Sequence, residues 1–173
     1  MAVLKIRTWP DEVLKTKAEP VAAVDDGVRK LLSDMAETMY REAGIGLAAP
    51  QVGVSRRVIV LDVPGEEEGE PGSGLIYAVN PRIVSRGGKC KITEGCLSFP
   101  GLEIDVERAE RVTVEWLDGD GNPRTRDCQD LLAICFQHEI DHLDGIVFTD
   151  RIGLVRRRLA LRDFARMQQE PRA

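Results

Sequence analysis

The two histidines of this chain are its only ones, and they lie four residues apart in His138-Glu139-Ile140-Asp141-His142. On a helix, side chains four positions apart share one face, so both imidazole rings could bind the same divalent metal ion. The carboxylate of Glu139 would then be free to act as a general base. Two unrelated surface histidines would not need an acid between them at this spacing. The motif therefore predicts a metal centre with its own base.

A catalytic metal ion of this kind needs a third protein ligand, and the histidine motif does not locate it. In one class of zinc peptidase a third histidine follows a glycine, but here Gly145 is followed by Phe148 at the ligand position. The best candidate is Cys96, in Glu94-Gly95-Cys96-Leu97-Ser98-Phe99-Pro100, because a glycine precedes it and a strand-breaking proline follows. A thiolate there would complete a Cys-His-His site.

Three helices are expected to position these residues. Apolar positions from Asp130 to Leu143 stay in register with the two histidines, which predicts a buried helix closed by Gly145. A helix over 25–43 is predicted to start at aspartate caps and to end at Gly44. A last helix, over 154–168, is rich in arginines that most simply form a solvated face: Arg156, Arg157, Arg158, Arg162 and Arg166.

Short strands, expected to be antiparallel, fill the space between the helices. They are predicted over 58–63, 75–79, 111–117 and 124–128, with an acidic, solvated loop over 65–74 and a hairpin turn over 118–123. That turn begins like a calcium-binding loop, but Pro123 and Gln129 replace the required glycine and glutamate. Gly44-Ile45-Gly46 follows a helix and leads into a strand, which is the reverse of a dinucleotide-binding motif.

Length and composition limit the class of protein. A chain of 173 residues suits one domain, 1–173, whose core needs no disulfides. It has no stretch of 18 apolar residues and its start lacks the features of a secretory signal, so we expect no membrane insertion and a cytoplasmic location. The net charge of -5 argues against direct DNA binding. Cys128 and Cys135 lie in apolar surroundings and are expected to be buried structural thiols.

Three motifs together resemble those of the peptide deformylase family, and the resemblance covers nearly the whole chain. They are Gly44-Ile45-Gly46-Leu47-Ala48-Ala49-Pro50-Gln51, then Glu94-Gly95-Cys96-Leu97-Ser98, then Gln137-His138-Glu139-Ile140-Asp141-His142. The resemblance implies a compact α+β domain, with antiparallel sheets around a central metal-binding helix and with a C-terminal helix. It also implies removal of the formyl group from the N-terminal formyl-methionine of newly synthesised proteins.

The resemblance implies a role for each matching residue. The metal ligands would be Cys96, His138 and His142, and Glu139 would take a proton from water and pass it to the departing amine. The side-chain amide of Gln51 and the backbone N–H of Leu97 would stabilise the developing oxyanion, although Gln51 could instead merely cap a turn. Glu94 is expected to pair with Arg108. Residues beside the metal helix would bind the substrate: Gly44, Ile45, Gly46, Leu131, Ile134 and Cys135.

Some expectations concern the ion and the partners. The resemblance implies one Fe(II) ion per chain in cells, while Zn(II), Ni(II) and Co(II) also suit a sulfur-nitrogen site. Nascent formyl-methionyl peptides are the expected partners, and the basic last helix suggests a transient ribosome contact. Two other classes are weighed against this reading. An endopeptidase with the same histidine motif usually comes with secretion or a pro-segment, and a silent metal-binding module would be expected to lack Glu139.

Overall fold

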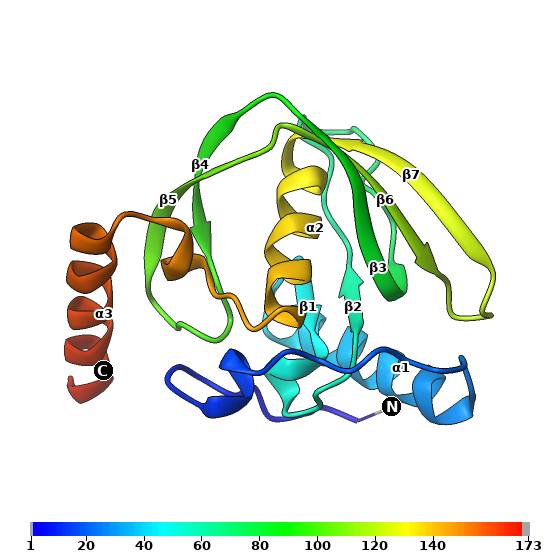
Figure 1. The fold of residues 1–173 in the computed structure, drawn as a ribbon, viewed down its shortest axis with the longest axis horizontal. Coiled ribbons are helices and arrows are strands. Elements are labelled where there is room, and N and C mark those ends of the chain that lie inside the picture. The colour runs from blue at the N-terminus through cyan, green and yellow to red at the C-terminus, as the bar shows by residue number, and fades with distance from the viewer. Residues whose placement is uncertain (1, 171–173) are drawn as a thin grey trace.

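The structure, a computed structural model that describes residues 2–170, places one helix between two antiparallel sheets (Figure 1). The larger sheet has five strands in the order β1-β2-β3-β6-β7, and β4 pairs with β5 in the smaller one. The helix between them is α2 (Asp130–Leu143). The strands are β1 (Gly46–Ala48), β2 (Val58–Leu61), β3 (Ile76–Gly87), β4 (Cys90–Gly95), β5 (Glu103–Arg108), β6 (Arg111–Leu117) and β7 (Pro123–Gln129). The expected arrangement of sheets around a central helix is therefore confirmed.

Helix α2 has the predicted bounds, and every residue from Ala133 to Leu143 is buried. Its apolar side chains pack against inward-facing residues of the larger sheet, where Trp116 and Phe136 have ring centroids 5.4 Å apart. Gly145 ends it with φ 73, and a Cβ at this position would lie only 2.6 Å from the Lys15 carbonyl oxygen. Because only glycine tolerates both conditions at once, the predicted stop is confirmed.

Helix α1 (Asp26–Arg41) begins as predicted but ends earlier. The Asp25 carboxylate accepts a hydrogen bond from the Val28 N–H at 2.9 Å, which is a normal N-cap. At the other end Ala43, with φ 55, takes the left-handed position, and the Gly44 N–H donates to the Met39 carbonyl. The helix therefore does not extend to residue 43, and Gly44 does not end it. A Cβ at Gly44 would lie 2.9 Å from Leu97, so this glycine permits close packing instead.

The strand predictions were incomplete around residues 76–108. Strand β3 continues far beyond residue 79, because a register shift at Asn80 and Pro81 carries it past the proline. The Asn80 side chain bonds the backbone N–H and carbonyl of Val21, which holds this irregular point. Strands β4 and β5 were not predicted at all. The β6–β7 hairpin closes through the predicted turn, where the Asp118 carboxylate accepts backbone N–H groups of Asp120 and Asn122.

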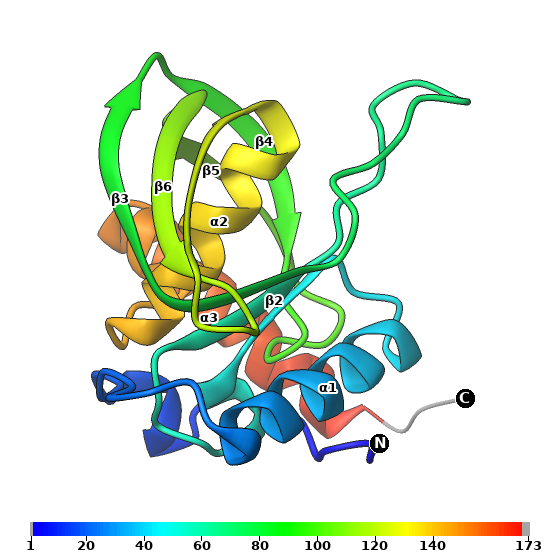
Figure 2. The ribbon, with the colours of Figure 1, turned by 90° about the vertical axis from the view of Figure 1, so that its right-hand side faces the viewer.

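The remaining elements cover the ends of this core. Three 3-10 helices, η1 (Glu12–Lys15), η2 (Ala49–Val52) and η3 (Phe148–Arg151), link the larger elements. The long loop between β2 and β3 projects away from the body (Figure 2). Helix α3 (Leu154–Gln169) buries Ala160 and Phe164. Most of its arginines are exposed as expected, but Arg157 is half-buried and pairs with Asp150 at 3.2 Å.

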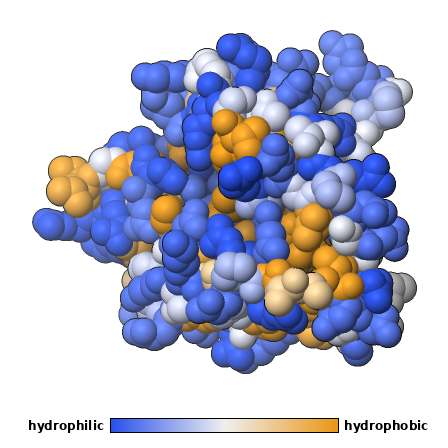
Figure 3. All heavy atoms as spheres, turned by 45° about the vertical axis from the view of Figure 1, so that its right-hand side comes forward, coloured by the Kyte–Doolittle hydropathy of each residue, from blue (hydrophilic) through white to orange (hydrophobic). Residues whose placement is uncertain are grey.

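Hydrophilic side chains predominate on the face in Figure 3, and apolar side chains form separate patches. None of the helices in the described part of the chain has the length and apolar character needed to cross a membrane.

Candidate metal centre

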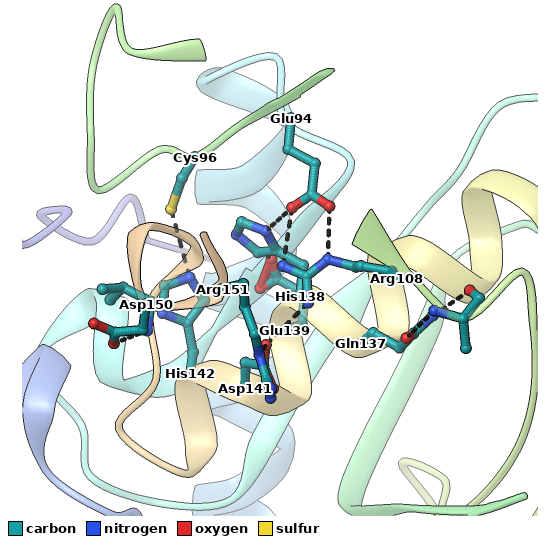
Figure 4. Close-up of polar contacts among 12 residues, drawn as sticks. Glu94, Cys96, Arg108, Gln137, His138, Glu139, Asp141, His142, Asp150 and Arg151 are labelled. Atoms are coloured by element: carbon teal, nitrogen blue, oxygen red, sulfur yellow. Dashed lines mark hydrogen bonds and ion pairs between the residues drawn. The ribbon is translucent and has the colours of Figure 1, made fainter. Parts of the chain in front are cut away.

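Three potential metal ligands meet where the smaller sheet faces α2 (Figure 4). Cys96 follows the last residue of β4 directly, while His138 and His142 lie one turn apart on α2. One ligand atom of each residue lies within 4.8 Å of the others, and Cys96 Sγ is 3.5 Å from His142 Nε2. Fold topology thus brings the predicted thiolate to the two predicted imidazoles.

This donor set fits a tetrahedral divalent cation. Zinc–sulfur and zinc–nitrogen bonds of about 2.3 and 2.05 Å place two ligands of a tetrahedral ion about 3.6 Å apart, close to the distance between Cys96 and His142. The Nδ1 atom of His142 is buried and has no hydrogen-bond partner among the described residues. Burial, followed by the charge of His138, holds the pKa of His142 well below its usual range, so this imidazole is neutral and ready to bind a cation.

A buried ion-pair network orients His138. Its Nδ1–H donates to Glu94 Oε1 at 2.8 Å, which leaves Nε2 for the centre. Burial opposes the charged form of His138, but hydrogen bonds with Cys96 and Glu94 prevail and raise its pKa well above the usual value. A cation entering the site would therefore displace a proton.

Arg108 holds the orienting carboxylate in turn. Its Nε and Nη2 donate to the two oxygens of Glu94 at 2.6 and 3.0 Å, as the resemblance implied. Burial disfavours the charge on Glu94, yet the hydrogen bonds from His138 and Arg108 prevail and lower the pKa of this carboxyl group. Burial likewise opposes the charge of Arg108, but Glu94 and Asp141 raise its pKa. The pair is thus charged and rigid.

Glu139 lies beside the three candidate ligands but forms no hydrogen bond with them. Its Oε1 is 3.8 Å from His138 Nε2, and its Oε2 is buried without a hydrogen-bond partner in the described chain. Burial raises the pKa of Glu139 to about 7, against the opposing charges of His138 and Arg108. A carboxyl group with this pKa can both accept and donate a proton near neutral pH.

Gln51 faces the same centre from η2. Its Oε1 accepts the Ala48 N–H at 2.9 Å, so it does cap a turn. Its Nε2 points the other way, towards Ser98 Oγ at 3.1 Å and Cys96 Sγ at 3.7 Å. The two functions considered from the sequence are therefore compatible in one side chain. Leu97, the other expected donor, follows Cys96 directly and lines the adjoining cavity.

A cavity of about 750 Å³ opens onto the centre. All six residues expected to bind substrate line it: Gly44, Ile45, Gly46, Leu131, Ile134 and Cys135. Cys135 and Cys128 are both buried, as predicted. The N-terminal segment also lines the cavity, through Leu4, Lys5, Ile6 and Thr8. The sequence did not predict this, because the segment carries no recognisable motif.

Two further residues near the centre belong to the third motif, but no role for them was predicted from the sequence. Gln137 bonds both backbone groups of Ala109, which ties α2 to the chain between β5 and β6. Asp141, inside the histidine motif, accepts hydrogen bonds from Arg108 and Arg151. The motif spacing marked Asp141 as a neighbour of the ligands, but nothing in the sequence pointed to its partners.

Comparison with known proteins gives consistent matches. A family model described as polypeptide deformylase matches residues 3–158. A peptide deformylase of Alkalilimnicola ehrlichii is 45% identical over 172 residues, with 99% of this chain and 94% of the relative covered. One from Symbiobacterium thermophilum is 53% identical over 152 residues, covering 87% of this chain and 67% of the relative. The crystal structure of peptide deformylase from Ehrlichia chaffeensis in complex with actinonin has a TM-score of 0.91 and 43% identity, and covers 98% of this chain and 100% of that one.

Proposed function

The chain belongs to the polypeptide deformylase family, an enzyme family that removes the N-formyl group from nascent peptides, and from this premise we propose the role of each site residue. The protein is a metal-dependent hydrolase whose substrate is the formylated N-terminal methionine of newly synthesised proteins and whose products include formate. We assign Cys96, His138 and His142 as the metal ligands. The convergence of these three donors within 4.8 Å is the observation that carries the assignment.

Glu139 acts as the general base and then as the general acid. A divalent cation, when bound, would lower the pKa of a coordinated water towards about 7 and polarise the formyl carbonyl. Glu139 accepts the proton of the attacking water and later donates it to the departing amine. Its unpartnered Oε2 and its pKa of about 7 support both steps.

Gln51 and the backbone N–H of Leu97 stabilise the oxyanion. The amide nitrogen of Gln51 is directed at the centre because the amide oxygen is held by Ala48. Donors fixed before the reaction lower the barrier without any reorganisation during the step. The Ser98 hydroxyl, which accepts from the same nitrogen, keeps the amide in place until the oxyanion forms.

The cavity binds the methionine side chain and the start of the peptide. Leu131, Ile134 and Cys135 offer an apolar wall beside the ligands. Strand β1 lies at the edge of the five-stranded sheet, so an extended peptide can pair with Gly44–Gly46 as an added strand. Backbone pairing is indifferent to side chains, which suits an enzyme that acts on many different new proteins.

The ion and the cellular context complete the proposal. We propose Fe(II) as the ion in cells, with Zn(II), Ni(II) or Co(II) able to replace it, because one sulfur and two nitrogens accept all four. We place the activity in the cytoplasm, where formylated chains emerge from ribosomes. The relatives matched over most of the chain carry the deformylase name, and this does not favour the endopeptidase alternative.

We also propose a transient ribosome contact through α3. Arg158, Arg162 and Arg166 are exposed on this helix, where they can meet phosphate groups. Replacing all three by glutamate should reduce co-sedimentation with ribosomes and leave turnover of a short peptide unchanged. Unchanged co-sedimentation would exclude the contact.

A formate-release assay tests the proposed chemistry. Protein purified without oxygen and loaded with iron is incubated with a short formyl-methionyl peptide. Glu139→Gln removes the base without changing the ligands, so turnover should fall at least about a hundredfold while metal content stays at one ion per chain. Turnover like that of the wild type would remove Glu139 from the mechanism.

A second variant tests the thiolate ligand. Cys96→Ser should lower both metal content and turnover, because a hydroxyl binds a soft divalent ion poorly. Cys90→Ser is the matched control, since this free, half-buried cysteine on β4 is outside the ligand cluster. Full metal content and full activity in Cys96→Ser would exclude the thiolate as a ligand.

A further inference from the structure

The carboxylate of Asp141 is held by two arginines from different parts of the chain (Figure 4). Arg151, at the end of η3, donates Nη2–H to Oδ1 at 2.6 Å and Nε–H to Oδ2 at 2.9 Å. Arg108, on β5, donates Nη1–H to the same Oδ2 at 2.9 Å. Asp141 has a side-chain exposure of 10% and Arg151 one of 43%, so a largely buried acid is clamped from the surface.

These contacts continue to a proposed metal ligand. Arg108 uses its other two nitrogens, Nε and Nη2, on Glu94, and Glu94 in turn accepts the Nδ1–H of His138. Arg108 and Glu94 have side-chain exposures of only 4% and 5%. The path Arg151, Asp141, Arg108, Glu94, His138 therefore consists of charge-assisted hydrogen bonds, with solvent reaching mainly its outer end.

Arg151 and Arg108 both donate hydrogen bonds to the carboxylate of Asp141. Arg151 supplies a donor to each oxygen of Asp141, and Arg108 adds a single hydrogen bond to Oδ2. Without that clamp, Asp141 Oδ1 would lose the one donor that it has among the described residues. Asp141 would then compete with Glu94 for the guanidinium of Arg108. A weaker grip on Glu94 loosens the hydrogen bond that orients His138.

We propose that Arg151 is a positioning residue: by clamping Asp141 it keeps the Arg108 fork on Glu94 and so holds His138 in position for the cation. The proposal rests on the proposed function, namely that Cys96, His138 and His142 bind a divalent ion. Arg151 is outside both the ligand cluster and the lining of the cavity, so it would act only through the intervening side chains.

Geometry and charge make opposite predictions for this residue. Removing a positive charge near the centre would by itself favour cation binding, whereas releasing the clamp would weaken it. Arg151→Lys separates the two effects, because lysine keeps the charge but cannot span both oxygens of Asp141 with a planar fork. A weaker cation affinity in Arg151→Lys therefore reports on positioning alone.

The experiment measures affinity for Co(II) and Zn(II) by competition with a chelator, together with the absorption spectrum of the Co(II) protein. Outer contacts of metal ligands typically contribute ten- to hundredfold in affinity, and Arg151 is several contacts away, so we expect Arg151→Lys to raise Kd by roughly three- to tenfold. The Co(II) ligand-field bands should shift as well. Arg156→Lys is the matched control, because Arg156 bonds the Asp105 carbonyl and should leave Kd and spectrum unchanged.

A double-mutant cycle tests the path itself. In an Asp141→Asn background, Arg151→Lys should have little further effect on Kd, since the acid that it clamps is gone. An effect of equal size in that background would overturn the proposal, as would a wild-type Kd and spectrum in Arg151→Lys. If the wild-type protein bound no Co(II) and showed no thiolate-to-metal band, the metal site itself would fail. That outcome is distinct from failure of the role of Arg151.

Discussion

Adding a single methyl group at Gly46 is expected to displace the proposed general base, Glu139, and so to slow the reaction. A Cβ at this position would lie 2.8 Å from Cys135 Sγ, 3.0 Å from Glu139 Cγ and 3.1 Å from Glu139 Cδ. Ordinary contacts are about 3.4 Å or longer, so these atoms must retreat by roughly half an ångström. Gly46 is outside the set of glycines with positive φ, and alanine therefore brings no backbone strain of that kind. The effect should come from contact alone.

The size of the loss follows from this displacement. A misplacement of about 1 Å at a reacting group can cost a hundredfold in rate, so half of that should cost Gly46→Ala roughly tenfold or somewhat more in kcat. Formate release from a formyl-methionyl peptide measures kcat and KM separately. Gly153→Ala is the matched control, because nothing lies within 4 Å of a Cβ there.

A second substitution identifies which contact matters. Cys135→Ala in the Gly46→Ala background removes the sulfur contact but leaves the contact with Glu139, so activity should stay low. Full recovery in the double variant would mean that Cys135, and not the base, had been displaced. The reasoning would be refuted if Gly46→Ala had the kcat of the wild type and the same urea unfolding transition as the wild type.

Three other perturbations should give measurable results. Gln51→Ala should lower kcat/KM for formate release about a hundredfold if the amide stabilises the oxyanion. The exposed charged residues that line the cavity are two acids, Glu42 and Glu103, and one base, Lys5. Because the acids outnumber the base, a peptide with lysine at its third position should react several-fold faster than one with glutamate, and Glu103→Lys should reduce or reverse that preference. The hydrogen bond from Lys30 lowers the pKa of Asp34 below its usual 3.8, so the contribution of Asp34 to stability is present above that pH and lost as pH falls through the lowered pKa. Asp34→Asn should therefore lower the free energy of unfolding, measured with urea, by about 1 kcal/mol at neutral pH and far less once the pH has fallen below the lowered pKa of Asp34.

Helix α2, which carries both histidines, was the most predictable part of the molecule. Its apolar positions and the two histidines share one periodicity, and Gly145 fixes its end, so pattern and structure agree from Asp130 to Leu143. Cys96 could be proposed from its local turn residues. Its distance from the histidines could not, because it depends on how β4 pairs with β5 and packs on α2.

The missed elements have physical explanations. Strand β4 buries a single residue, Glu94, and exposes every second position, so its sequence lacks the apolar alternation on which a strand prediction depends. The strand predicted over 75–79 is longer in the structure, because a bulge at Asn80 and Pro81 lets β3 continue past the proline. Arg151 could not be identified at all, since its partner Asp141 is apparent only when η3 folds back onto α2.

The orientation of the Gln51 amide also limits which molecules can inhibit this enzyme. The backbone N–H of Ala48 can only donate, so it must face the amide oxygen of Gln51. The amino group of the same amide is then directed at Cys96 in the centre. An inhibitor that presents an acceptor to this amino group gains a hydrogen bond. Because the Gln51 side chain is already held in one orientation, forming that bond costs little conformational entropy. A compound with a donor at that point meets another donor, and the side chain cannot turn over to receive it without breaking its own turn.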